Sequence, residues 1–233
     1  GEIPSKANAK LISLADDPVQ FQEWVKSCAS LRDSDKKKIL KQTNQLISIK
    51  NEQSSANAVR NYIFGSNNKG RLTGFRKPNA DKLTQMVLFF AEKVKPFKTK
   101  MNKLLFYADF LYFRDNALSI SGMQYVAINH GPVPDNFQSI FEYLSNEGFI
   151  VREAQKFPSG KEGTIFTTST NHKFDASLFT EAELQTLNSV ADTFQSSSAT
   201  EITEISHLEQ AWIENENNKS AINYEYAFEL MHI

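Results

Sequence analysis

One segment constrains the fold of this chain more than any other: an almost unbroken apolar and aromatic band from Leu104 to Phe113. The surrounding pattern predicts a helix over residues 99–114. A helix that is apolar on nearly every side has to be buried on nearly every side. Asp109 lies inside the band. Since a buried carboxyl group requires hydrogen-bond partners or a shifted pKa, we expect Asp109 to organise the residues around it.

Apolar residues at helical spacing predict further helices on both sides of this band. In the first part of the chain they cover residues 7–15, 18–28 and 33–49, and after it residues 79–94, 135–147, 180–195, 198–206 and 224–232. Three of the later helices begin with capping-box pairs, in which each partner bonds a free backbone N–H of the first turn. The pairs are Asp135 with Gln138, Thr180 with Glu183, and Ser198 with Glu201.

Two regions read as extended chain. Residues 119–134 look extended. This stretch ends at Pro132 and Pro134, which together with Gly131 are expected to set a rigid turn. Residues 149–156 and 164–168 predict a hairpin around Pro158-Ser159-Gly160. The helix that precedes this hairpin gives a winged-helix-like order. We therefore expect a mainly α fold of the α+β type, with a small wing-like β-hairpin.

The composition changes within residues 51–78, which are rich in Asn, Ser, Gly and Lys. This change predicts a linker between a helical segment, residues 1–50, and a main domain, residues 79–233. Residues 1–80 carry 14 Lys and Arg against 7 Asp and Glu, whereas residues 81–233 carry 12 against 20. The opposite charges indicate either two units with different partners or two solvated surfaces.

Several classes of protein are excluded by the sequence. The single cysteine, Cys28, rules out a disulfide framework and fits a reducing compartment, so we expect a cytoplasmic protein. No apolar run approaches the roughly 20 residues that span a membrane. The start of the chain has no signal-peptide core and no initiator Met, which predicts a piece of a longer parent.

The sequence contains few residues in patterns typical of catalytic or cofactor-binding sites. It has no phosphate-binding loop, no dinucleotide glycine pattern and no nucleophile elbow. None of the four histidines is spaced for a metal site. His207 with Glu209 is one candidate ligand pair, but a hydrogen-bonding role for His207 is commoner. The basic run Lys36–Lys38 fits either phosphate contact or a solvated surface. We expect no catalytic residue, no cofactor and no metal, and hence no enzyme.

One series of motifs is familiar. Lys103-Leu104-Leu105-Phe106-Tyr107-Ala108-Asp109 is followed by Ser119-Ile120-Ser121-Gly122-Met123-Gln124-Tyr125, then by Gly131-Pro132-Val133-Pro134, and later by His207 and Trp212. The series closely resembles the Panacea domain of SocA-like antitoxins and of phage-associated, GepA-like proteins. The resemblance covers roughly residues 80–215. Phe106 stands where the family commonly has Tyr, a difference of one hydroxyl group.

A second, shorter resemblance lies at the start. Gly1-Glu2-Ile3-Pro4-Ser5-Lys6-Ala7-Asn8 is similar to the tail of an Xre-type helix-turn-helix, just after its recognition helix. On this interpretation the helix-turn-helix itself lies upstream of residue 1. That would also account for the missing Met and the basic first part of the chain.

The resemblance implies a function. Panacea-domain proteins are identified with antitoxins that bind a protein toxin directly, and the toxin is expected from a neighbouring gene. An upstream helix-turn-helix would add binding to operator DNA. The alternatives are a DNA-binding transcription regulator, with the hairpin as a wing, and an adaptor that delivers a partner to a protease.

The motif residues are the candidate site: Lys103, Tyr107, Asp109, Tyr125, Gly131, Pro132, Pro134, His207 and Trp212. We expect Tyr107, Asp109 and Tyr125 to form a polar cluster in the centre of the domain. Bracing of the fold is favoured over toxin contact for this cluster, with Asp109 accepting from tyrosine hydroxyls or from the Gly131–Pro134 turn. His207 and Trp212 are expected to attach the acidic C-terminal part to the core.

Overall fold

The computed structural model describes residues 17–65, 68–156, 160 and 162–233. Contacts divide the chain into two compact units that meet in sequence between Val59 and Arg60, and each unit is described by itself. The helix expected at residues 7–15 and the helix-turn-helix-like start lie outside the described residues.

The first unit begins with α2, Pro18–Ser27, as the sequence predicts. Asp17 caps it, because its carboxylate accepts the backbone N–H groups of Val19 and Gln20 at 3.0 and 3.3 Å. Pro18 fills the first helical position, where the N–H that proline lacks would have no partner in the helix.

Helix α3, Asp33–Phe64, is longer than expected. The predicted helix at residues 33–49 is confirmed, and it continues without a break through residues 51–64, the first part of the stretch interpreted as a linker. Asn and Ser are only moderately poor helix formers, and this stretch has no Gly or Pro to end the helix. The first breaker is Gly65, at φ +96°. The division into segments 1–50, 51–78 and 79–233 stays a prediction.

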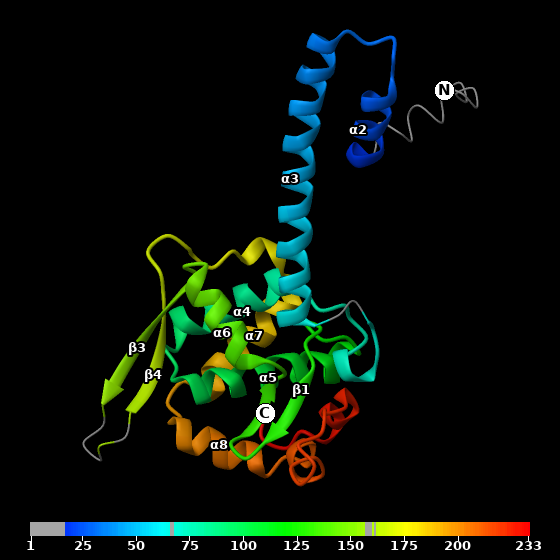
Figure 1. The fold of residues 1–233 in the computed structure, drawn as a ribbon. Helices are drawn as coiled ribbons and strands as arrows, with labels where there is room; N and C mark the ends of the chain where they lie inside the picture. The colour runs from blue at the N-terminus through cyan, green and yellow to red at the C-terminus, as the bar shows by residue number, and fades with distance from the viewer. Residues whose placement is uncertain (1–16, 66–67, 157–159, 161) are drawn as a thin grey trace. The chain divides into compact units, whose positions relative to one another are not determined.

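Helix α5, Lys98–Asn116, is the centre of the second unit, and every residue from Lys100 to Phe113 is buried. Helices α4 (Ala80–Lys93), α7 (Glu181–Phe194) and α8 (Ala199–His207) pack around it (Figure 1). The prediction of a central helix buried on nearly all sides is confirmed. The position of α5 places its polar side chains, Asp109 included, inside the core.

Two small antiparallel hairpins complete the unit. Strands β1 (Tyr125–Ile128) and β2 (Gly131–Pro134) pair with Tyr125 opposite Pro134 and Ile128 opposite Gly131. Strands β3 (Ile150–Lys156) and β4 (Glu162–Thr168) form the predicted wing-like hairpin after helix α6 (Phe137–Asn146). An isolated bridge between Phe97 and Ile165 joins β4 to the segment before α5. The fold is mainly α with small β-hairpins, as expected.

The capping boxes at Thr180–Glu183 and Ser198–Glu201 are confirmed. The one expected at Asp135 is wrong: Asn136 precedes α6 in the left-handed region, at φ +57°, and Asp135 instead accepts the N–H of Asn136. The last predicted helix is a short 3₁₀ segment, η3 (Tyr224–Glu229), because the backbone turns extended at Leu230.

The remaining elements are short: η1 (Arg71–Thr73), η2 (Ala176–Leu178) and α9 (Gln210–Ile213). No helix in the described part of the chain has the length and apolar character needed to cross a membrane.

Candidate functional site

Asp109 is completely buried and lies at the centre of a hydrogen-bond network. Its Oδ1 accepts the backbone N–H groups of Ile120 and Ser121 at 2.8 and 2.7 Å. Its Oδ2 accepts the Ser121 hydroxyl and the Tyr125 hydroxyl, the latter at 2.8 Å. Three donors from the loop between α5 and β1, and a fourth from Tyr125 at the start of β1, therefore converge on one side chain of α5. Asp109 fixes the path of the chain into β1.

Burial raises the pKa of the Asp109 carboxyl group, while the hydrogen bonds from Ser121, Tyr125 and Ile120 oppose this shift. The Tyr125 hydroxyl has a single hydrogen but two acceptors nearby, Asp109 Oδ2 and the Leu105 carbonyl at 2.9 Å. This hydroxyl can therefore donate fully to only one of the two acceptors at a time. Burial and the charge of Asp109 also raise the pKa of Tyr125.

The loop that reaches Asp109 depends on a close backbone approach at Gly122. This glycine has φ +74°, and a Cβ added to it would overlap the carbonyl group of Lys77. Tyr224 closes the network from the C-terminal part, with its hydroxyl donating to the Met123 carbonyl at 2.8 Å. The loop is thus held between α5, the segment before α4 and η3.

Lys103 lies on α5 and is also completely buried. Its Nζ donates to the carbonyl of Pro132 at 2.9 Å, and no carboxylate of the described residues pairs with it. Burial lowers the pKa of Lys103 to about 7. A Cβ added to Gly131 would stand 2.8 Å from this Nζ and 2.5 Å from Oγ of Ser206, so only glycine fits here.

Tyr107 does not join the Asp109 cluster, contrary to expectation. Its hydroxyl donates instead to Glu209 Oε1 at 3.2 Å. Glu209 is nearly fully buried and also accepts the backbone N–H of Met231 at 3.1 Å, with Nδ1 of His232 at 3.1 Å. Burial, and then the charge of Glu209, raise the pKa of Tyr107. This second network attaches the C-terminal residues to α5.

His207 and Trp212 stack on each other, with ring centroids 3.8 Å apart and planes 13° apart. Nε1 of Trp212 donates to the carbonyl of Ile128 at 2.8 Å, which connects α9 to β1. Nε2 of His207 is buried without a hydrogen-bond partner. Burial and then the charge of Lys103 lower the pKa of His207. The expected attachment of the C-terminal part is therefore made by Trp212 and, separately, by Glu209.

Sequence reasoning did not identify Glu183 as more than a capping residue. Its buried carboxylate accepts from Arg76 at 2.9 Å and from Lys82 at 2.5 Å, besides the N–H of Thr180. Burial alone would raise the pKa of Glu183, but the Lys82 hydrogen bond, the Thr180 N–H and the two cations together lower it. The capping box identifies Glu183 from residues that are close in sequence. Its ion pairs join residues about a hundred positions apart, which the sequence does not indicate.

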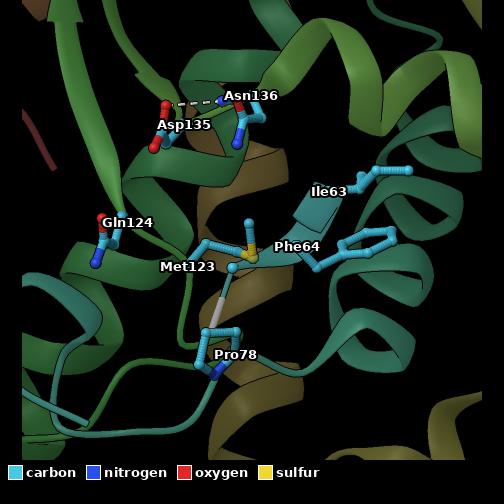
Figure 2. A pocket seen from close by; sticks show the side chains of 8 residues that line it. Ile63, Phe64, Pro78, Met123, Gln124, Asp135 and Asn136 are labelled. Carbon is cyan, nitrogen blue, oxygen red and sulfur yellow. Dashed lines mark hydrogen bonds between the residues drawn. The ribbon is translucent and has the colours of Figure 1, made fainter. Parts of the chain in front are cut away.

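Two features of the described residues bear on the binding of a metal or a small ligand. In the described residues no three His, Cys, Asp or Glu side chains come together as a metal site. Figure 2 shows a pocket between the end of α3, the segment around Pro78 and the residues that flank β1 and β2. One wall is apolar, with Phe64, Pro78 and Met123. The polar wall has Gln124, Asp135 and Asn136 but no second titratable group beside Asp135.

Residues 101–213 match the family model described as Antitoxin SocA-like, Panacea domain. Comparison with curated proteins and with solved structures gives no match. The matched segment runs from the first turn of α5 to the end of α9, and it contains all nine candidate residues. Residues 101–213, just under half of the chain, are therefore similar to the SocA-like Panacea domain.

Proposed function

We propose that the protein is an antitoxin that neutralises a protein toxin by binding it directly. The observation that carries this proposal is the match of residues 101–213 to the SocA-like antitoxin family. We place the action of the protein in the cytoplasm, with the product of a neighbouring gene as the toxin.

The burial of the motif residues supports a role in binding rather than catalysis. Lys103, Tyr107, Asp109 and Tyr125 are each 0% exposed, so they do not reach a partner or a substrate. They hold α5 to the β1–β2 hairpin, the loop before it and the C-terminal part through the hydrogen bonds described above. We infer that the motif braces a scaffold whose surface makes the contacts with the toxin. Such surfaces act by shape, apolar area and charge.

The proposal is tested by co-expressing the chain with the product of the adjacent gene, with an affinity tag on one protein. We expect the chain to restore growth and to co-purify with that product. A matched control is Asp109→Ala, which should unfold the scaffold and lose both effects. Growth arrest that persists with both proteins present in the soluble fraction, and no complex, would contradict the antitoxin function.

Regulation of its own operon is a second part of the proposal, and the basic face of α3 supports it. Lys37, Lys38 and Lys41 are exposed on this helix. Exposed lysine ammonium groups neutralise the phosphate groups of DNA. The β3–β4 hairpin offers less, because Lys156 pairs with Glu162 at 3.4 Å and Arg152 is offset by Glu153. A gel shift with operator DNA, with and without the upstream segment, separates the two regions. Loss of binding with Lys37→Glu and Lys38→Glu is expected; unchanged binding would contradict a role for α3.

A further inference from the structure

The C-terminal part of the second unit exposes several large apolar side chains to solvent. Four large side chains of this part are between 42 and 62% exposed: Leu208, Ile213, Phe228 and Met231. Single exposed apolar residues are ordinary on protein surfaces, but a group on one layer marks an interaction surface. Whether these four belong together depends on how α8, α9 and η3 are joined.

Two hydrogen-bonded contacts join them. The backbone N–H of Met231 donates to the carboxylate of Glu209, the residue that follows Leu208. The Tyr226 hydroxyl donates to Glu214 at 2.6 Å, which joins η3 to the end of α9, next to Ile213. Helix α9 contacts both α8 and η3, so it connects these elements (Figure 1). We call these four residues and the glutamates around them the C-terminal surface.

The aromatic part of this surface rests on a fixed base. The ring of Phe228 packs 5.8 Å from the ring of buried Phe113, and Phe75 stacks on the same ring at 6.2 Å. Phe75 is 47% exposed and has φ +54°, a costly conformation for a bulky residue. Strain of this kind persists only where the surroundings impose it, and it gathers at functional positions. Two exposed rings are thus held in place before any partner arrives.

Most of the charged residues around the apolar side chains are acidic. Residues 199–233 contain seven glutamates and one lysine. Arg71 pairs with Glu225 at 3.5 Å, but in the described residues no Lys or Arg pairs with Glu204, Glu214 or Glu229. Carboxylates without a cationic partner at the rim of an apolar surface attract a basic partner and repel an acidic one. A symmetric dimer through this surface would bring the same glutamates face to face, which disfavours a second copy of the chain.

We propose that the C-terminal surface binds a basic segment of the toxin that carries apolar side chains, with Phe228 and Phe75 as anchors. This proposal rests on the antitoxin function proposed above and names the surface that performs it. The anchors contact apolar side chains of the toxin, and Glu204, Glu214 and Glu229 face its Lys and Arg. Prealigned aromatic side chains lose little conformational freedom on binding, which suits them to carry much of the affinity.

The test measures the dissociation constant of the purified complex with the adjacent-gene product, at two salt concentrations. Phe228→Ser and the double variant Glu204→Lys/Glu229→Lys should each weaken binding at least about tenfold. The double variant should also reduce the salt dependence. Val151→Ser and Glu147→Lys are matched controls on β3 and at the end of α6, and they should bind as the wild type does. Circular dichroism and gel filtration check the fold and the oligomeric state of each variant.

Each other outcome overturns the inference in a different way. If the wild type binds and both C-terminal variants bind equally well, the surface is wrong but the antitoxin function stands. If the variants change the oligomeric state and leave toxin affinity unchanged, the C-terminal surface binds a second copy of the chain and not the toxin. If the wild type neither binds nor rescues growth, the proposed function and this inference fall together.

Discussion

The hydroxyl group of Tyr125 lies 2.8 Å from Oδ2 of Asp109, and both side chains are completely buried. The same carboxyl group accepts two backbone N–H groups and a serine hydroxyl, from residues 11 and 12 positions further along the chain. A single side chain of α5 thus satisfies the backbone of a loop that has no regular structure. The relationship makes Asp109 a structural requirement of the domain.

Replacement of Asp109 by Ala should destabilise the second unit severely. The N–H groups of Ile120 and Ser121 and the Ser121 hydroxyl would lose this acceptor, while Tyr125 would keep only the Leu105 carbonyl. Each unpaired buried group costs free energy. We expect a loss of about 3–5 kcal/mol in the free energy of unfolding. Tyr125→Phe removes one of the donors and should cost about 1–2 kcal/mol. Urea denaturation followed by circular dichroism measures both, and equal losses for the two variants would contradict the central position of Asp109.

Gly131 and Gly148 offer a matched pair of substitutions to Ala. Both have positive φ, +92° and +75°, so an alanine at either position would be strained in the left-handed conformation. Only at Gly131 would the new methyl group overlap neighbours, at Ser206 and Lys103, whereas the space at Gly148 is open. We expect losses of about 3 kcal/mol for Gly131→Ala and about 1 kcal/mol for Gly148→Ala. Thermal melting compares the two variants, and a larger loss of stability for Gly148→Ala would contradict the packing argument.

Local signals in the sequence were sufficient for much of this fold. The apolar band of α5 and the capping pairs at Thr180 and Ser198 are read within a few residues, and all three predictions are confirmed. The extension of α3 was missed because its Asn- and Ser-rich composition suggests a loop, although no breaker occurs before Gly65. Composition favours a conformation only weakly when the helix is already propagating.

The contacts of the candidate site were harder to foresee. Tyr107 bonds Glu209, which lies 102 residues away, and Glu183 bonds Arg76, which lies 107 residues away. Such pairs leave no periodic trace in a single sequence, because the distance between them is set by the packing of whole elements. The Asp109–Tyr125 pair was predicted, since a buried carboxyl group needs donors and a tyrosine 16 residues on supplies one.

Trp212 should contribute to stability mainly through its indole N–H. The Trp212→Phe variant keeps most of the ring but leaves the carbonyl of Ile128 without its donor at 2.8 Å. We expect a loss of about 1–2 kcal/mol. Trp24→Phe is the control, because Trp24 is 41% exposed and should change stability by no more than about 0.5 kcal/mol. Similar losses of stability for Trp212→Phe and Trp24→Phe in chemical denaturation would show that the indole hydrogen bond contributes little.

Lys103 should make the stability of the second unit depend on alkaline pH. Its pKa is about 7 in the folded protein and near 10.5 in the unfolded chain, so the unfolded chain binds more protons between these values. The free energy of unfolding should therefore rise with pH across this window, by about 3 kcal/mol between pH 7 and 9.5. Below pH 7 the lysine is charged in both states and adds no further slope.

Lys103→Met keeps the volume of the side chain and removes the charge, so it should abolish this rise and be more stable than the wild type at pH 7. Urea denaturation at four or five pH values compares the two proteins, and the difference between them cancels titrations of other groups. Parallel curves from pH 7 to 9.5 would mean that Lys103 keeps an ordinary pKa. In that case a charged amine would sit in the core beside Pro132, and its substitution would show no pH dependence at all.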